Sequence, residues 1–344
     1  MNILVFRFSA MGDVALAQPV IKNVLENNPE VHLTFVSHKN LKPLFLDLPN
    51  FTFIGVDLKA DYNGFLGIIK LFTVLKKTGK YNYIIDLHSV LRTWALCFLF
   101  SLIGISYKRI NKGRKEKKEL TGKEKTDFFL LKHTTKRYAE VFEKLGLKTS
   151  EVKTQRINPS ARASKSLRPF LTENNLLPKN NQWIGIAPFS KHKQKEWGIE
   201  KVNKLIEILS KNNTTIFLFG GGKSEVERLE NLAADHNNTM VAAGKLNFER
   251  EMALIAQLDA MVTMDSFNMH LAGLLGTKVV SIWGATHHFA GFGPLGKNKK
   301  FIVEVPREKL ACRPCSVFGN KPCHRGDHAC MKEIQVENVL AFLK

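Results

Sequence analysis

The sequence predicts an α/β fold in two domains with parallel sheets covered by helices. Short apolar segments alternate with helical segments along most of the chain, which is the pattern of strands joined by helical crossovers. Residues 3–25 and 260–276 both follow the order strand, polar turn and helix. Because 344 residues exceed the usual size of one hydrophobic core, we expect domains at 1–160 and 161–344.

The first domain is predicted to begin with a strand, a turn and a helix, at 3–8, 9–13 and 15–25. Further strands are expected at 32–36, 51–56 and 83–87, and further helices at 65–76, 94–105 and 127–145. The first turn holds one glycine and lacks the G-x-G-x-x-G fingerprint of nicotinamide and flavin sites. The polar stretch 148–166, without a strong period, is predicted to link the domains.

Asp13 lies at the end of that turn, where the first helix begins. A carboxylate at this position stabilises a helix through its dipole, and this role needs no ligand. The same carboxylate is able to act as a general base toward a bound substrate. Asp13 is our candidate catalytic residue, and both roles stay open.

The second domain is predicted to start with a strand at 183–187, the loop PFSKHKQKEW and a helix at 199–210. Ser190 and Lys195 of this loop are candidates for binding a diphosphate, although a lysine-rich surface loop has the same composition. A strand at 215–219 leads into three glycines and Glu225, which fits either a ribose contact or a helix-start acid. The segment GGGKSE lacks the P-loop pattern and does not indicate ATP hydrolysis.

A β-α-β unit follows, with strands expected at 260–263 and 278–283 and a helix at 269–276. Asp265 and Ser266 offer N-cap chemistry, and His270 lies near the start of the helix. Free N–H groups and the helix dipole stabilise phosphate at such a point. The three side chains therefore indicate an anion site, with a simply capped helix as the alternative.

Lysine and arginine outnumber acidic residues by 51 to 31, which gives a formal charge of +20. The excess is densest at 108–137, where Lys115, Lys117 and Lys118 form the candidate acceptor or membrane patch. Nucleic acid, an anionic bilayer and a phosphorylated substrate each suit this charge, and so does a solvated loop without a partner.

The N-terminus reads as a strand and shows no signal peptide, so we expect a cytoplasmic protein. The longest apolar run, 94–105, is about half as long as a spanning helix. We expect a buried helix there, or a helix that lies against a membrane surface with the basic residues that follow it.

Four of the five cysteines lie close together near the end of the chain, at Cys312, Cys315, Cys323 and Cys330. In a cytoplasmic protein this clustering suggests a structural metal such as zinc more than disulfides, although the spacing is not that of a standard zinc finger. Reduced thiols packed in the loop, and redox or disulfide chemistry, stay open as alternatives. We expect a structural role, because the loop comes late in the chain and is predicted to lie away from the strand-end acids and bases.

In this order, the motifs resemble glycosyltransferase family 9, the ADP-heptose:lipopolysaccharide heptosyltransferases. The resemblance covers nearly the whole chain and is carried by ILVFRFSAMGDVALAQPVI, APFSKHKQKEW, LFGGGKSE, MDSFNMHLAGLLGTKVVSIWGAT and the cysteine-containing tail. It implies the GT-B fold, in which two Rossmann-like domains with parallel sheets face a central cleft. The first would bind the acceptor and the second the nucleotide sugar.

By the same resemblance, Asp13 falls on the catalytic acid-base position. The donor-site positions fall on Lys195, Glu225, Asp265, Ser266 and His270. Phe267 departs from the family, which commonly has glycine there, and its bulk would narrow the approach to the phosphates.

The implied reaction is an inverting transfer of a heptose or related sugar, with no cofactor required for catalysis. The donor would be an ADP-sugar, and the acceptor a phosphorylated, lipid-linked sugar of the lipopolysaccharide inner core at the cytoplasmic face of the inner membrane. Nucleic acid is not an expected partner. A nucleotide-sugar epimerase of the same build and a basic nucleic-acid-binding protein are the alternatives.

Overall fold

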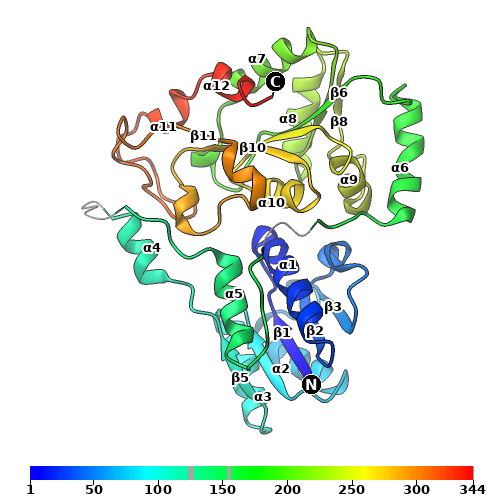
Figure 1. Ribbon diagram of the computed structural model, residues 1–344, viewed down its shortest axis with the longest axis vertical. Helices are drawn as coiled ribbons and strands as arrows, with labels where there is room; N and C mark the ends of the chain where they lie inside the picture. The colour runs from blue at the N-terminus through cyan, green and yellow to red at the C-terminus, as the bar shows by residue number, and fades with distance from the viewer. Residues whose placement is uncertain (123–127, 153–155, 344) are drawn as a thin grey trace. The chain divides into compact units, whose positions relative to one another are not determined.

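The structure, a computed structural model, describes residues 1–122, 128–152 and 156–343. Its contacts divide the chain into two compact units, each built around one parallel sheet (Figure 1). Unit 1 comprises Met1–Gly113 and Lys132–Lys153, and unit 2 comprises Arg114–Leu131 and Thr154–Lys344. The predicted α/β class is confirmed. The division differs from a single boundary at residue 160, because 114–131 makes its contacts with unit 2.

Unit 1 contains a five-stranded sheet with the order β3-β2-β1-β4-β5 and parallel pairing throughout. Its strands are β1 (Asn2–Phe6), β2 (His32–His38), β3 (Phe51–Val56), β4 (Tyr83–Asp86) and β5 (Ser106–Arg109). The first four agree with the predicted strands to within two residues at each end. The sequence does not predict β5, because a four-residue edge strand carries little periodic signal.

The helices of unit 1 include two packed pairs and one 3₁₀ helix. They are α1 (Met11–Asn27), the 3₁₀ helix η1 (Lys39–Phe45), α2 (Gly64–Lys77), α3 (Leu91–Ser101) and α5 (Thr134–Glu143). Helix α1 packs against α5, and α2 packs against α3. Leu4 and Phe6 of β1 share a buried cluster with Leu71 of α2 and Leu96 of α3. The alternation of β1 therefore fixes which of its sides faces the second helix pair.

The longest apolar run forms α3 and the turn after it. Leu96, Cys97 and Phe100 are buried, but Trp94 and Phe98 are exposed. The expectation of a buried helix thus holds for one face of α3 only. Among the described residues, no helix combines the length and the apolar character that a membrane span requires.

Unit 2 contains a six-stranded parallel sheet with the order β11-β10-β9-β6-β7-β8. Its strands are β6 (Gln182–Ala187), β7 (Thr214–Leu218), β8 (Thr239–Val241), β9 (Ala260–Met264), β10 (Lys278–Trp283) and β11 (Ile302–Glu304). The consecutive β-α-β unit predicted from 260 to 283 is present as β9, α10 (Phe267–Leu274) and β10. The two short edge strands β8 and β11 are not predicted by the sequence.

The remaining helices of unit 2 include one that begins inside the predicted linker. They are α4 (Arg114–Leu120), α6 (Ala161–Glu173), η2 (Lys193–Lys195), α7 (Ile199–Ser210), α8 (Lys223–Ala233), α9 (Phe248–Ile255), η3 (His288–Ala290), η4 (Gly296–Lys300), α11 (Ala329–Lys332) and α12 (Val336–Leu340). The N-cap of α6 is Ser160, whose side chain accepts from the backbone N–H of Ala163 at 3.0 Å. The predicted linker at 148–166 therefore ends at Ser160.

The basic segment 114–131 is held to unit 2 by apolar and aromatic contacts. Leu120 and Leu131 share a buried cluster with Ala290, and Phe128 stacks on Phe289 at 4.9 Å between ring centroids. The ammonium of Lys117 lies 5.7 Å from the ring centroid of Phe292. Residues 123–127 of this basic stretch lie outside the described residues.

Candidate active site

The carboxyl edge of the sheet in unit 1 brings Asp13 against a buried arginine. Arg7 follows β1, and its guanidinium forms an ion pair with the Asp13 carboxylate and donates to the carbonyl of Leu87 at 2.8 Å. The Asp13 side chain is 38% exposed, whereas that of Arg7 is 7% exposed. A buried cation thus fixes the orientation of a carboxylate that solvent still reaches.

Tyr138 and His88 complete the surroundings of this pair. The hydroxyl of Tyr138 donates to the carbonyl of Asp13 at 3.3 Å, and the Tyr138 ring lies 5.9 Å from the Arg7 guanidinium. Nε2 of His88 lies 3.4 Å from the hydroxyl of Ser9. Burial, followed by the charges of Arg7 and Lys112, lowers the pKa of His88 to about 3. His88 is therefore uncharged at neutral pH.

Asp86 shapes the turn that carries His88. It is fully buried at the end of β4 and accepts from the backbone N–H groups of His88 and Ser89, at 2.9 and 2.7 Å. Its second oxygen accepts from Thr93 at 2.9 Å and from Arg109 at 3.1 Å. Because every oxygen of this buried carboxylate is hydrogen-bonded, the turn next to Asp13 has a fixed shape.

The carboxyl edge of the sheet in unit 2 brings Lys195 to Asp265. The Lys195 ammonium donates to the carbonyl oxygen of Asp265 at 2.6 Å and to its carboxylate at 3.3 Å. The Thr286 hydroxyl donates to the same carboxylate at 2.9 Å. Lys195, Asp265 and Thr286 follow β6, β9 and β10, which are neighbours in the sheet. Three strand ends therefore hold one cation at the start of α10.

Ser266 is the N-cap residue of α10, and its hydroxyl lies 3.1 Å from that of Thr263. His270 lies one turn into the helix and is half-buried. Phe267 occupies the first helical position, and its ring contacts Phe248 of α9 at 5.9 Å. Asp265, Ser266 and His270 thus share one helix start, and the departure at Phe267 has a packing partner in unit 2.

Ser190 and Glu225 lie at the same edge of the sheet. The Ser190 hydroxyl is 3.5 Å from the carbonyl oxygen of Asp265, so it borders the lysine site. Glu225 accepts from the backbone N–H of Gly221 at 2.7 Å. This carboxylate holds the glycine turn before α8, as the helix-start interpretation expects. The ribose contact of Glu225 stays a prediction.

Arg313, which the sequence does not mark as a site residue, lies next to Thr286 and hydrogen-bonds to the ends of several strands. Arg313 is 1% exposed and donates to the carbonyl oxygens of Gly284 at 2.7 Å and Trp283 at 3.0 Å. It also donates to the carboxylate of Glu304 at 3.0 Å. Arg313 therefore supports the loop that positions Thr286 over Asp265.

Glu304 also faces His287 and His288, whose Nε2 atoms lie 3.4 Å from its two oxygens. This is the one group of three metal-ligand side chains within 4.8 Å among the described residues. Burial opposes the charge of Glu304, but hydrogen bonds from both histidines and the charge of Arg313 hold its pKa well below the usual range.

The chemistry of these three residues favours a closed hydrogen-bond network. Nδ1 of His287 accepts from the backbone N–H of Phe289 at 3.1 Å, which places the ring proton on Nε2, facing Glu304. A metal ion would have to displace that proton beside the Arg313 guanidinium. We therefore assign this group to the support of the loop 284–290.

The cysteine-containing tail loop contacts the lysine site. A side-chain carbon on Gly319 would lie 2.6 Å from Cγ of Lys195, so the loop backbone packs directly on the lysine stem. The backbone N–H groups of Cys315 and Ser316 both donate to the carbonyl of Ala285 at 3.1 Å. The expectation that the tail loop lies away from the strand-end acids and bases is therefore wrong. Gly319 and Lys195 are far apart in the sequence, and only the fold brings them into contact.

All five cysteines are free thiols in the structure, and Cys330 is buried. Burial raises the pKa of the Cys330 thiol to about 11, and Cys312, Cys315 and Cys323 lie near enough to act in the same direction. In the described part of the chain, these four do not supply three ligand atoms within 4.8 Å of one another. The structural metal stays a prediction.

Elemental analysis of the purified protein tests that prediction. If the tail cysteines bind a structural metal, about one equivalent per chain will be found, and Cys312→Ser with Cys315→Ser will remove it and lower the melting temperature. Cys97→Ala, which lies outside the tail loop, is the control and leaves the metal content unchanged. Less than about a tenth of an equivalent in the wild type contradicts metal binding.

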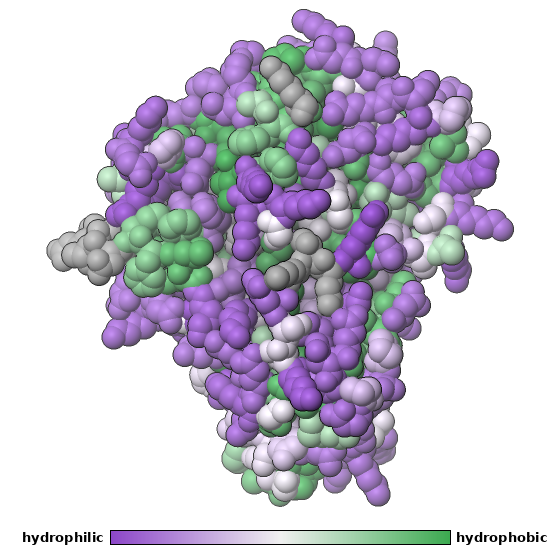
Figure 2. All heavy atoms as spheres, viewed as in Figure 1, coloured by the Kyte–Doolittle hydropathy of each residue, from purple (hydrophilic) through white to green (hydrophobic). Residues whose placement is uncertain are grey.

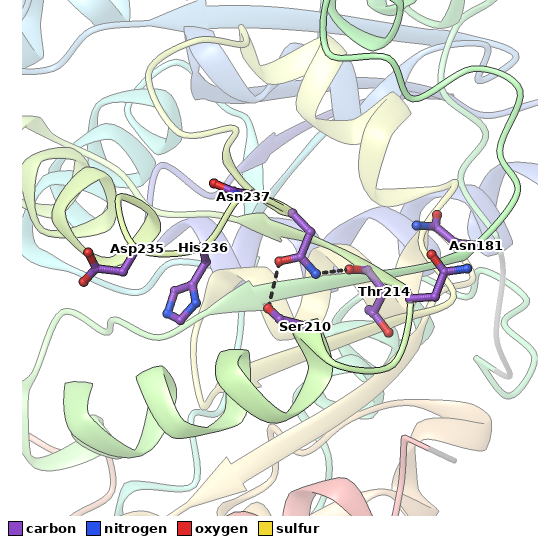
Figure 3. Close-up of a pocket in the computed structure, with 8 residues that line it drawn as sticks. Asn181, Ser210, Thr214, Asp235, His236 and Asn237 are labelled. Carbon is purple, nitrogen blue, oxygen red and sulfur yellow. Dashed lines mark hydrogen bonds between the residues drawn. The ribbon is translucent and has the colours of Figure 1, made fainter.

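A surface cavity of about 390 Å³ lies in unit 2, at the amino ends of the strands of its sheet, on the edge opposite Lys195 and Asp265. It is lined by residues that include Asn181, Thr214 and Asn238, which directly precede or begin β6, β7 and β8 (Figure 3). Asn238 donates to the carbonyl of Thr214 at 2.6 Å. Because ligands of open α/β sheets bind at the carboxyl ends of strands, this cavity is not the candidate site.

The comparisons with known proteins agree with the resemblance read from the motifs. Residues 68–318 match the family model described as glycosyltransferase family 9 (heptosyltransferase). The chain is 27% identical to the lipopolysaccharide core heptosyltransferase OpsX of Haemophilus influenzae, over all of this chain and 96% of that protein.

Solved structures of low identity show the same fold. A family 9 glycosyltransferase from Veillonella parvula has a TM-score of 0.77 at 20% identity, with 99% of this chain and 96% of that chain covered. The Escherichia coli heptosyltransferase WaaC with ADP has a TM-score of 0.69 at 19% identity, with 100% and 99% covered. The fold is GT-B. The family model matches most of the sequence, so the chain belongs to glycosyltransferase family 9 and is a glycosyltransferase.

Proposed function

We propose that this enzyme transfers a heptose from an ADP-linked donor to the inner core of lipopolysaccharide, with inversion at the anomeric carbon. The observation that carries the proposal is the full-length similarity to a lipopolysaccharide core heptosyltransferase. The epimerase and nucleic-acid alternatives are not favoured, because the family match is to glycosyltransferases.

Asp13 acts as the general base in this proposal. Its carboxylate removes the proton from an acceptor hydroxyl while that oxygen attacks the anomeric carbon. Arg7 is a positioning residue, since its buried guanidinium orients the carboxylate. His88 supports the same edge as an uncharged ring next to Ser9.

Lys195 and the first N–H groups of α10 stabilise the departing diphosphate. The lysine supplies a fixed positive charge, and the helix start supplies N–H donors for phosphate oxygens. Ser190, Ser266 and His270 are proposed to contact the donor at this edge, and Glu225 to accept from its ribose. This charge neutralisation needs no catalytic cofactor.

The direct test is incubation with ADP-heptose and a truncated, heptose-acceptor lipopolysaccharide. Mass spectrometry is expected to find acceptor that has gained one heptose, together with release of ADP. Substitution of UDP-linked sugars in the same assay is the donor control. A product only with another nucleotide sugar, or hydrolysis without transfer, contradicts the proposed reaction.

Replacement of Lys195 by alanine is expected to weaken ADP binding about 10- to 100-fold, the scale of a hydrogen bond to a charged group. The charge of Asp265 also loses its partner and repels phosphate. Adenosine, which has no phosphate, is expected to lose much less affinity. Calorimetry of Lys193→Ala, an exposed lysine of the same loop, provides the matched control. Equal losses for ADP and adenosine contradict a phosphate role.

The basic helix α4 is proposed to bind the phosphates of the acceptor or the anionic surface that carries it. Lys115 and Lys118 are exposed, whereas Lys117 is half-buried against Phe292 and Phe318. Lys115 and Lys118 therefore present most of the accessible charge. A cytoplasmic location at the inner membrane would place them next to such a surface.

Reversal of Lys115 and Lys118 to glutamate is expected to raise the KM for a vesicle-embedded acceptor several-fold and to leave the KM for the donor unchanged. The difference from wild type should shrink as salt is raised, because screening limits these charges to about 8 Å at physiological ionic strength. The matched control is Lys299→Glu with Lys300→Glu, two exposed lysines elsewhere in unit 2. Equal effects from both pairs would mean that net charge alone is responsible.

A further inference from the structure

Helices α2 and α3 of unit 1 carry a row of large apolar side chains on the surface. Leu66 is 78% exposed and Phe98 is 60% exposed, and three further members of the row are similarly open, whereas the other three are 36–39% exposed. The exposed set is Phe65, Leu66, Ile69, Val74, Leu91, Trp94, Phe98 and Leu102. An apolar surface of this extent is unusual on a soluble protein and indicates a binding surface.

The spacing of these residues gives each helix two apolar faces. On α3, Leu91, Trp94, Phe98 and Leu102 follow one another at intervals of three or four residues and point outward. Leu96, Cys97 and Phe100 lie on the other side, in the core. The inner face therefore accounts for folding. On the outer face, Trp94 donates to the Ser89 hydroxyl and packs against Arg109, whereas the burial of the core assigns no role to the more exposed Leu91, Phe98 and Leu102.

Helices α2 and α3 pack against each other. Phe72 of α2 and Phe100 of α3 meet edge to face at 4.8 Å beneath it, and the Arg92 guanidinium donates to the carbonyl of Tyr62 just before α2. Apolar atoms are visible on the surface at the end of unit 1 that carries α3 (Figures 1 and 2).

The charges around this face are mainly positive, and the neighbouring exposed acid is Asp61, just before α2. Residues 62–113 contain eight lysines and arginines and a single acid, Asp86. Asp86 is fully buried and paired with Arg109, so it contributes no negative charge to the surface. Lys70, Lys76, Lys77 and Lys80 are exposed on α2 or just after it. The face thus combines insertable apolar groups with a cationic border.

We propose that the outer face of α2 and α3 docks on an anionic bilayer, with its apolar side chains inserted at the level of the lipid headgroups. A helix surface that joins large apolar residues to lysines binds at such an interface. The proposal deepens the proposed function, on which it rests for the lipid-linked nature of the acceptor. It assigns docking to residues of unit 1 that are distinct from the basic helix α4.

A second copy of the chain is the less suitable occupant. Pairing of this face with itself would bring the same lysines of both copies together, and these lysines outnumber the neighbouring exposed acid, Asp61. Like charges brought together oppose association. Phosphate headgroups instead supply the complementary charge.

Cosedimentation of the full-length protein with vesicles tests the proposal. The wild type is expected to bind vesicles of phosphatidylethanolamine and phosphatidylglycerol and to bind phosphatidylcholine vesicles weakly. Leu66→Ser with Phe98→Ser should lower the partition coefficient on the anionic vesicles by about 10-fold or more, because two exposed apolar side chains no longer insert. The loss should persist at high salt, unlike that from a charge reversal.

The matched control is Leu177→Ser, which removes an exposed leucine of unit 2 and is compared with Leu66→Ser alone. The Leu177 variant is expected to bind vesicles like the wild type. An equal loss from these two single variants, unchanged binding of the α2–α3 variant, or a wild-type dimer that the α2–α3 substitutions convert to a monomer overturns the proposal.

A water-soluble, deacylated acceptor separates this proposal from the proposed function. With that acceptor, the α2–α3 variant is expected to keep the wild-type kcat/KM, while its KM for a vesicle-embedded acceptor rises. If neither acceptor supports transfer by any form of the protein, the proposed reaction fails and the vesicle measurements still decide the docking surface. A variant that loses activity on both acceptors contradicts a role limited to docking.

Discussion

Asp13→Asn is expected to lower turnover by about 100-fold or more, the scale of general acid–base catalysis. Asparagine has the size of aspartate, and its amide oxygen is able to accept from Arg7, so the turn before α1 should keep its shape. What the amide cannot do is take up the proton of an attacking hydroxyl. The loss should therefore appear in kcat, with ADP affinity unchanged.

The buried arginine makes a stability control necessary. Asp13→Asn leaves the Arg7 guanidinium without an ionised partner, and an unpaired buried charge destabilises a protein. Thermal unfolding and ADP titration of the same sample show how much of the protein is folded. Asp57→Asn, which breaks the surface ion pair with Lys39, is the matched control and should keep its activity. Turnover of Asp13→Asn within a few-fold of wild type, per folded molecule, would rule out the general base.

The periodic elements of the fold are the ones that the sequence predicts well. The strands β3 and β10 and the helix α7 coincide with the ranges 51–56, 278–283 and 199–210. The two strands are short, mostly apolar segments and the helix has a clear helical period, and all three end at polar or glycine-containing turns. The edge strands β5, β8 and β11 have three or four residues each, too few to establish a period.

The sequence predicts those site residues that directly follow the strands. It does not predict the side-chain and loop contacts that hold them in place. Residues after parallel strands gather at one edge of a sheet, so Lys195 and Asp265 could be expected at the same edge although 70 residues separate them. Arg7 interrupts an apolar strand, and that charge was a usable signal for a buried partner of Asp13. The contact of Gly319 with Lys195 depends on the path of an irregular loop, which no sequence period encodes.

Arg313 is the clearest case of a residue whose importance appears only in the structure. In the sequence it stands between two cysteines as one of many basic residues. In the fold its guanidinium donates to Glu304 and to carbonyl oxygens at the ends of β10 and β11, including Trp283, Gly284 and Val305. The carbonyl contacts are buried and Glu304 is 21% exposed, so the carbonyl oxygens above all need their donor.

Arg313→Met is expected to lower the free energy of unfolding of unit 2 by about 3–5 kcal/mol, the usual cost of breaking a buried ion pair from one side. Methionine fills part of the volume but leaves Glu304 charged and several carbonyl oxygens without a donor. Loss of support for Thr286, which binds Asp265, should also weaken ADP binding. Arg325→Met is the matched control, since its ion pair with Asp327 is exposed and contributes about 0–1 kcal/mol.

The pH dependence of the stability lost in Arg313→Met tests whether the ion pair with Glu304 causes the loss. The folded-state pKa of Glu304 lies below its usual value, so its interactions stabilise the fold above pH of about 4.3 and are lost as pH falls toward the folded pKa. Without Arg313, the pKa of Glu304 should move back up, and wild type and variant should become more alike in stability below that pH. Urea unfolding at pH 7 and near pH 3.5, followed by tryptophan fluorescence, measures this convergence. A difference that is equally large at both pH values would mean that the carbonyl contacts of Arg313, and not its ion pair with Glu304, dominate its effect.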